Sequence, residues 1–488
     1  MKLLRSFFSQ TIYYGFSSVL ARLLGFLLVP LYMAYFPTGE YGKVTIFYSV
    51  ITFLAIIFSL GMESAFFRFI NQTKEKKEVY STTAIILFFS SLIVLLIGQI
   101  TLQVFPKESE YFVYIVWLFL ITFIDTLCVL PFAKLRQEEK AKSFAIIKTV
   151  NIILNLSFNL FFIVLCPYLL ARKPDFFDWL KLLYNSEVGI GYIFISNLIA
   201  SGVTLLLLSP VVYNQVKWSH FSFSLSKKMF SYSFPLIIAG LAYATNEVLD
   251  KILILYFLGA PAAGVYGAAY KLSIFMVLFV QAYRYAVEPY YFNNFKKNGF
   301  KKNYAKIMRY FVILSSLIFL TISLNIEYIM DLLLLYSDYA NEYKKGLEII
   351  PIILMAHLFL GIYYNLSMWY KLTNNTNYGA FISLLGAVIT IIFNLIFIPR
   401  IGYIGSAWAT LICYFTMALI SYLFSIRYYY IPYEKIKTTV YLISSVIIYM
   451  LASYFEINSI IYNLILIVLY ICIVIFLENL KSKRNEFY

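Results

Sequence analysis

The 488-residue chain is 62% hydrophobic and only 13% charged, which leaves too few polar side chains to cover the exterior of a soluble protein. Its net charge of +15 is spread over many short segments, a pattern that suits anionic lipid headgroups and argues against nucleic-acid binding. In hydrocarbon each segment must satisfy its own backbone hydrogen bonds, which favours helices. We therefore expect an all-α polytopic membrane protein.

Runs of about 20 apolar residues, the length needed to cross a bilayer, recur along the chain and predict about fourteen spans. They cover residues 8–33, 43–66, 81–104, 111–133, 144–170, 190–213, 232–258, 265–290, 308–326, 349–370, 377–398, 404–426, 438–455 and 459–477. The first run is too long for a signal peptide and is expected to remain as a span. Apolar residues resume after Glu327, so the segment 327–348 is expected to extend the ninth helix or to lie along the membrane surface.

The distribution of basic residues predicts the orientation. With both termini inside, the inner segments hold 25 Lys and Arg residues, far more than the outer segments hold. The strongest inner basic segments are residues 74–77, 134–142, 217–228 and 296–309. Because basic residues concentrate on the cytoplasmic side, we expect a bacterial inner-membrane protein with both termini in the cytoplasm.

A weak internal repeat divides the chain. The sequence Glu40-Tyr41-Gly42 between the first two spans matches Val265-Tyr266-Gly267 between spans 7 and 8. The same spacing along the sequence maps Glu63 onto Glu288, and aromatic residues follow both acids. The predicted organisation is an N-terminal lobe (1–213, spans 1–6), a cytoplasmic linker (214–231), a C-terminal lobe (232–426, spans 7–12) and spans 13–14 with a cytoplasmic tail (427–488). Two lobes of six spans each would be parallel repeats.

Ionisable residues inside the predicted spans are candidates for function, because each costs at least ~2.5–3.5 kcal/mol at mid-bilayer. The cations that could bind an anionic substrate, such as a pyrophosphate, are Arg22, Lys271, Arg284 and Arg68. The candidates for coupling or gating are Glu63, Asp125, Glu247, Asp250, Lys251 and Glu288.

Structural interpretations compete with these roles. Glu247 and Lys251 lie four residues apart and could neutralise each other, whereas Arg68 and Arg284 lie near span ends and could reach headgroups. Arg22 lies deep in its span without an acidic neighbour on its own helix. The four cysteines and two histidines lack metal-ligand spacing, and no nucleotide-binding motif occurs, so neither a cofactor nor an enzyme activity is expected.

Four segments, residues 20–42, 60–69, 258–271 and 394–410, resemble bacterial polysaccharide-biosynthesis flippases, which transfer O-antigen or capsule repeat units. The resemblance implies the multidrug/oligosaccharidyl-lipid/polysaccharide exporter superfamily, with two six-helix lobes and alternating access. It implies an undecaprenyl-pyrophosphate-linked oligosaccharide as substrate, membrane lipid as surroundings and a polysaccharide polymerase as a candidate partner. By the same resemblance, Arg22 aligns with the first-span arginine of these flippases.

Other functions compete with this one. Within the superfamily they are a lipid II flippase and a drug/cation antiporter, the latter usually lined by acids. From another class comes an O-antigen polymerase or ligase, which would need a large outer loop with Arg and His. A subunit of a proton-pumping complex would need charges in many spans, but spans 9 to 14 carry almost none. The sequence leaves the glycan, the coupling ion and the oligomeric state open.

Overall fold

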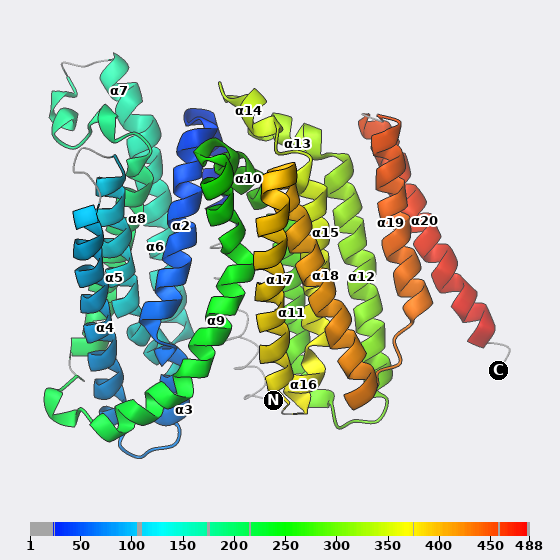
Figure 1. Cartoon of the computed structure of the whole chain (residues 1–488), viewed down its shortest axis with the longest axis horizontal. Helices are drawn as coiled ribbons and strands as arrows, with labels where there is room; N and C mark the ends of the chain where they lie inside the picture. Colours follow the sequence, from blue (N-terminus) through cyan, green and yellow to red (C-terminus); the bar gives the residue numbers. More distant parts are fainter. Residues whose placement is uncertain are drawn as a thin grey trace. The chain divides into compact units, whose positions relative to one another are not determined.

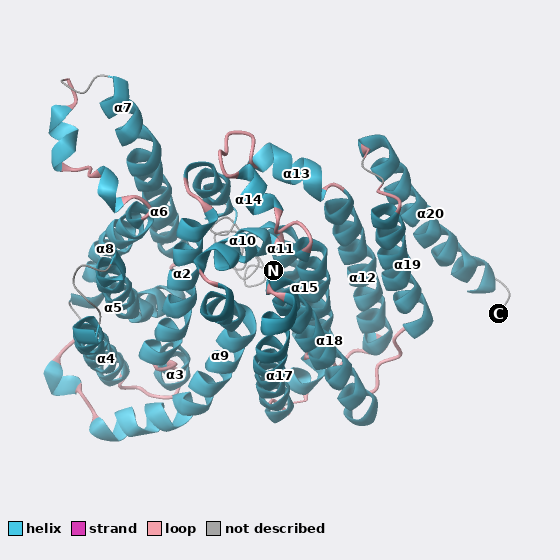
Figure 2. Ribbon diagram, turned by 45° about the horizontal axis from the view of Figure 1, so that its top comes forward, coloured by secondary structure: helices cyan, strands magenta, loops and turns pink. Residues whose placement is uncertain are grey.

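The computed structural model describes residues 23, 25–104, 110–172, 176–213, 216–373, 375–456 and 459–485. Every regular element within these ranges is helical, and most helices are long (Figures 1 and 2). The predicted all-α membrane class is therefore confirmed.

Eleven helical stretches of the described residues are long and apolar enough to cross a membrane, or twelve when the bent pair α10–α11 counts as one. The predicted number of fourteen is not confirmed. Most of the first predicted span, 8–33, lies outside the described residues. Its described end belongs to a short apolar helix, Gly25–Tyr35. The predicted seventh span falls in α9 (Phe223–Leu258), a 36-residue helix that is less apolar than the eleven.

The chain forms two compact units, Met1–Leu255 and Tyr256–Tyr488. The helices of the first unit are α2 (Thr38–Ser59), α3 (Met62–Ile70), α4 (Lys76–Val104), α5 (Glu110–Gln137), α6 (Ala141–Leu160), α7 (Cys166–Arg172), α8 (Gly191–Tyr213) and most of α9. Leu60 and Gly61 adopt positive φ angles and separate α2 from α3. A Cβ on Gly61 would lie 3.1 Å from that of Ser233, so this break also permits a close approach of α9.

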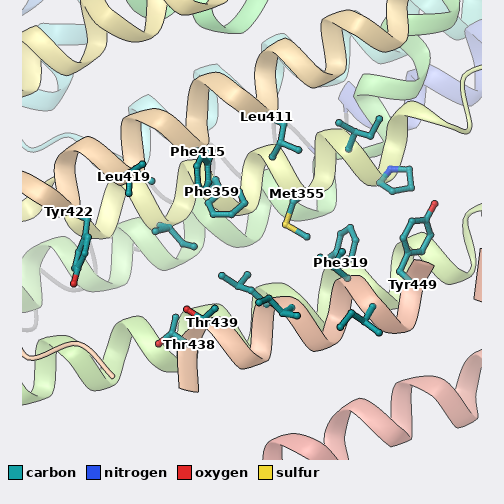
Figure 3. A pocket seen from close by; sticks show the side chains of 18 of the residues that line it. Phe319, Met355, Phe359, Leu411, Phe415, Leu419, Tyr422, Thr438, Thr439 and Tyr449 are labelled. Carbon is teal, nitrogen blue, oxygen red and sulfur yellow. The ribbon is translucent and has the colours of Figure 1, made fainter. Parts of the chain in front are cut away.

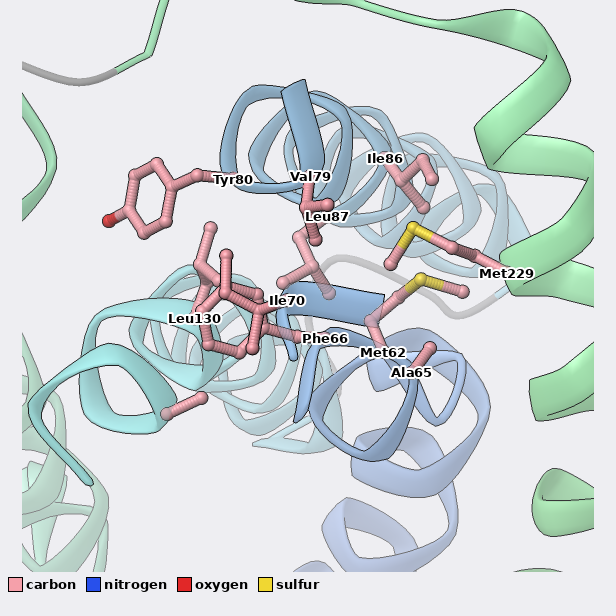
Figure 4. Packing of buried hydrophobic residues seen from close by; sticks show 11 residues of the cluster. Met62, Ala65, Phe66, Ile70, Val79, Tyr80, Ile86, Leu87, Leu130 and Met229 are labelled. Atoms are coloured by element: carbon pink, nitrogen blue, oxygen red, sulfur yellow. The ribbon is translucent and has the colours of Figure 1, made fainter. Parts of the chain in front are cut away.

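A buried apolar cluster fixes one end of the first unit (Figure 4). Met62 and Phe66 of α3, Val79 of α4 and Leu130 of α5 meet there, and Met229 adds the beginning of α9. Figure 1 shows α3 and the beginning of α9 at the same end of this unit, opposite α7. The cluster therefore positions α9 relative to the spans before any polar contact is considered.

The second unit is built around α15 (Ile349–Leu366), which is buried along most of its length. Its other helices are α10 (Ala260–Leu272), α11 (Ile274–Asn294), α12 (Phe300–Leu324), α13 (Ile326–Leu333), α14 (Ala340–Lys344), α16 (Met368–Leu372), α17 (Asn377–Ile401), α18 (Tyr403–Tyr428), α19 (Lys435–Tyr454) and α20 (Ile460–Asn485). At the turn between α17 and α18, Ser406 donates a 2.7 Å hydrogen bond to Asn394. A Cβ on Gly405 would lie 2.7 Å from that of Phe397, so only glycine permits this close packing.

Two details differ from the predicted spans. The ninth helix begins at Phe300, eight residues before the predicted start, so the basic residues Lys301 to Arg309 lie on a helix. It ends at Leu324, and α13 and α14 form separate short helices after it, so the segment 327–348 does not continue the ninth helix. Figure 1 shows α13 and α14 at the end of this unit opposite α16. The division into lobes at residues 213, 231 and 426 stays a prediction.

Candidate functional site

An ion pair between spans marks one end of the first unit. Glu63, in the first turn of α3, forms an ion pair with Arg136, near the end of α5. The guanidinium of Arg136 also lies 5.2 Å from the centre of the Phe67 ring. Both charged side chains remain more than a third exposed, so the pair is accessible from outside the helices.

A row of polar side chains continues along the middle of the first unit. The Asp125 carboxyl on α5 interacts with the Lys148 ammonium on α6 and with Ser201 on α8. Farther along, Asn151 donates a 2.9 Å hydrogen bond to Thr204. Asp125 and Lys148 are both exposed although they belong to apolar helices, which is typical of groups that line a hydrated space.

In α9 the charges are buried and mutually compensated. The Lys251 ammonium lies 2.9 Å from the Asp250 carboxylate and donates a 2.7 Å bond to the main-chain carbonyl of Glu247. The side chains of Asp250 and Lys251 are 1% and 9% exposed. The attraction between them offsets much of the cost of removing two charges from water.

The Arg284 group carries a net positive charge in the second unit; it consists of Arg284 and Glu288 on α11 and Lys371 on α16. The Glu288 carboxylate lies 3.1 Å from Arg284 and 2.8 Å from Lys371. Two cations share one acid, and all three side chains are about a third exposed. Sequence reasoning missed Lys371, because it follows the tenth span in an ordinary inner segment 83 residues from Glu288.

A hydroxyl network supports this group. The Asn365 amide donates to the Tyr291 hydroxyl at 2.9 Å and also to the Tyr283 hydroxyl. Tyr304 donates to the main-chain carbonyl of Asn365. These bonds tie α11 and α12 to α15, and the ring of Tyr364 on α15 lies 4.9 Å from the Arg284 guanidinium. Such a shell limits the side-chain motion of the cations.

The remaining predicted cations are not brought into this group. Arg22 lies outside the described residues. Lys271 is exposed in the last turn of α10, next to the 46° bend between α10 and α11. Arg68 lies at the end of α3 in the first unit, where it lines a separate pocket of about 490 Å³ with two lysines of α9.

An apolar groove of about 860 Å³ lies in the second unit (Figure 3). It is lined by α12, α15, α18 and α19, among them Phe319, Met355, Phe415 and Ile447. Polar groups gather at one end, where Lys435 and Thr438 begin α19. Its size and apolar lining suit a hydrocarbon chain better than a polar solute.

The fold and these sites define a class: a multi-pass α-helical membrane protein with charged groups on its helices and, in the second unit, an apolar groove. The polysaccharide biosynthesis protein family matches residues 7–295. The chain belongs to this family. A second family, MatE, matches residues 235–396.

Solved structures share the fold. The structure described as "Lipid II flippase MurJ, inward closed conformation" is 16% identical, with a TM-score of 0.75 over 96% of this chain and 99% of that chain. An inward-facing multidrug resistance MATE family transporter of the MOP superfamily is 14% identical, with a TM-score of 0.63 over 83% of this chain and 94% of that chain. No curated protein matches the sequence. The predicted exporter superfamily is thereby confirmed.

Proposed function

We propose that this protein is a flippase that moves undecaprenyl-pyrophosphate-linked oligosaccharide repeat units from the inner to the outer leaflet by alternating access. The observation that carries the proposal is the combination, within the second unit, of a cationic group and an apolar groove. A lipid-linked pyrophosphate needs both, because its headgroup is anionic and its tail is hydrocarbon. Membership of the polysaccharide biosynthesis family supports the glycan.

The pyrophosphate is bound by Arg22, Lys271 and Arg284 in this proposal. Guanidinium groups make charge-assisted and often bidentate hydrogen bonds to phosphate oxygens, which ammonium groups reproduce only as point charges. Glu288 and Tyr364 position Arg284, so the guanidinium group of Arg284 is partly ordered before the substrate binds. The protein carries out no covalent chemistry, and the polymerase that consumes the product is a candidate partner.

The test is surface polysaccharide in cells that express single variants. Arg284→Ala and Arg22→Ala should abolish surface glycan at normal protein levels, and Arg22→Lys should restore part of it. Arg427→Ala, which removes an exposed arginine at the end of α18, is the matched control and should be neutral. Normal glycan in both alanine variants would refute the pyrophosphate site.

The lipid II flippase alternative makes a different prediction for growth. Loss of lipid II transfer stops cell-wall synthesis, so depletion of the protein would lyse the cells. Loss of repeat-unit transfer removes surface glycan and leaves the cells viable. We expect the second result. The drug/cation antiporter alternative predicts drug sensitivity without any loss of glycan.

The proposed orientation places both termini in the cytoplasm of a bacterial inner membrane. Lys301 lies in the first turn of α12, on the basic side of this unit. Lys301→Cys should therefore react with an impermeant thiol reagent only after the membrane is permeabilised. Labelling in intact cells would invert the topology.

An ion gradient drives the cycle in this proposal, with Glu63 or Asp250 carrying a proton or Na⁺. The other intramembrane acids, Asp125, Glu247 and Glu288, act in gating. Glu63 pairs with Arg136, so a motion that separates α3 from α5 would break this ion pair. Transfer of the lipid-linked substrate in proteoliposomes should slow when pH and Na⁺ gradients are collapsed. Undiminished transfer would remove the coupling role.

A further inference from the structure

The beginning of α9 carries three distinct faces. Phe223, Phe230 and Phe234 lie seven and four residues apart, hence on one side of the helix, and are 77%, 40% and 63% exposed. Met229 and Ser233, which are fully buried, form a second face about a quarter of the way round the helix and pack against the spans. A helix with one buried face still exposes a row of phenylalanines, which water disfavours and acyl chains accept.

A basic pocket adjoins this phenylalanine row. It is lined by Arg68, Phe69, Lys227, Lys228, Ser231 and Tyr232, with a volume of about 490 Å³. Lys227 and Ser231 lie one helical turn apart, directly beside Phe230 and Phe234. Cationic and aromatic side chains therefore meet along one edge of α9.

The cations of the pocket face no acid within ion-pair distance among the described residues. The Arg68 guanidinium instead lies 4.3 Å from the centre of the Tyr232 ring, a cation–π contact that holds it beside the pocket. Arg68, Lys227 and Lys228 are all exposed. Three uncompensated cations around a pocket with a hydroxyl favour a phosphate group as ligand.

The pocket is rigidly placed. The main-chain amide of Ser222 donates to Thr82 of α4 at 3.1 Å, and that of Lys217 donates to Ser81 at 3.2 Å. These two bonds attach the segment before α9 to the beginning of α4. The site is therefore formed before a ligand binds.

We propose that this pocket binds the phosphate headgroup of an anionic membrane phospholipid, whose acyl chains lie along Phe223, Phe230 and Phe234. The ligand is a resident lipid of the leaflet at this end of the first unit. The phenylalanine row distinguishes a lipid from a soluble phosphate, because a soluble ligand would gain nothing from it. The site fixes the beginning of α9 at the membrane surface.

The experiment measures lipid retention by the purified full-length protein in native mass spectrometry, with phosphatidylglycerol and phosphatidylcholine supplied in equal amounts. The wild type should retain phosphatidylglycerol preferentially. Lys227→Gln/Lys228→Gln should lower its apparent affinity for that lipid about tenfold. The matched control, Lys76→Gln/Lys77→Gln, removes an adjacent exposed lysine pair near the same end and should retain the lipid.

Each alternative outcome overturns the proposal. Equal losses in both double variants would show diffuse attraction by the basic surface. Displacement of the lipid by millimolar glycerol 3-phosphate would assign the pocket to a soluble phosphate. Arg68→Gln, at an exposed position, provides an independent test in case the double variant misfolds. It should weaken phosphatidylglycerol binding while the protein keeps the elution volume of the wild type in size-exclusion chromatography. Unaltered binding would exclude the pocket.

Discussion

Two cation-containing regions of the second unit differ in charge balance: one is neutral and the other carries an excess positive charge. In the Arg309 network, which consists of Arg309, Glu434, Lys437, Tyr441 and Glu478, Arg309 lies 2.6 Å from Glu434 and 3.2 Å from Glu478. Tyr441 donates a 2.6 Å bond to Glu478. Two cations thus face two acids, and the Arg309 side chain is only 4% exposed. In the Arg284 group two cations share one acid at the accessible surface.

The difference separates a structural role from a binding role. A balanced network around a buried cation leaves no charge for a ligand, and the Arg309 network joins α12 to α19 and α20. The Arg284 group keeps an excess positive charge that an anion can neutralise. The balance of charges in three dimensions therefore indicates function better than the presence of a cation in a span.

Replacing Arg309 should have the largest effect on stability. Arg309→Met keeps the volume but leaves Glu434 and Glu478 without their central cation. Loss of one partner of a buried ion pair costs about 3–5 kcal/mol, and the partial exposure of both glutamates lowers our expectation to about 2–3 kcal/mol. The thermal midpoint of the purified protein should fall by about 2–3 °C.

Lys302→Met is the control for this substitution, because Lys302 is exposed two turns earlier on the same helix. Its midpoint should stay near that of the wild type. Equal midpoints for the two variants would mean that the Arg309 network does not hold α19 and α20 in place.

The sequence predicted the helical class and the positions of most spans, because long apolar runs specify membrane helices locally. The same reasoning placed the start of α12 too late, since it assigned Lys301 and Lys306 to a loop. Long lysine side chains on a helix can extend to the lipid headgroups. A basic turn at the end of a membrane helix and a basic loop therefore have similar sequences.

Ion-pair partners could not be predicted in the same way. Arg309 and Glu434 are 125 residues apart, and Glu288 and Lys371 are 83 residues apart. Only the packing of α12 with α19, and of α11 with α16, brings these groups together. Glu63 and Glu288 were matched by the internal repeat, but neither Arg136 nor Lys371 carried a signal that identified it as the partner.

Replacing Glu288 should change binding more than stability. Glu288→Gln removes the one acid of the Arg284 group, so the local positive charge rises. Removal of an ion pair that is about a third exposed costs about 1 kcal/mol or less. Binding of farnesyl pyrophosphate, a soluble analogue of the lipid carrier, should tighten roughly fivefold, as expected for one charge.

Tighter binding should slow substrate release, so surface glycan should fall in cells that carry Glu288→Gln. Glu348→Gln, at an exposed acid next to α15, serves as the control and should leave pyrophosphate binding unchanged. Weaker binding in Glu288→Gln would instead mean that the acid is needed to position Arg284, and would end the view of this group as an electrostatic anion site.

Replacing Lys437 should have the smallest effect, and that effect should depend on Arg309. The Lys437 ammonium lies 3.8 Å from Glu478 and donates a 2.6 Å bond to the main-chain carbonyl of Leu477. With Arg309 present, Glu478 already has a closer cation, so Lys437→Met should cost about 0.5 kcal/mol.

Without Arg309, Lys437 becomes the nearest cation to Glu478. The same substitution should then cost more, with an interaction free energy of about 0.5–1 kcal/mol between the two sites. Thermal midpoints of the wild type, both single variants and the double variant give this quantity directly. Additive shifts would show that Arg309 and Lys437 act independently, and Glu478 would then not be the residue that links α12, α19 and α20.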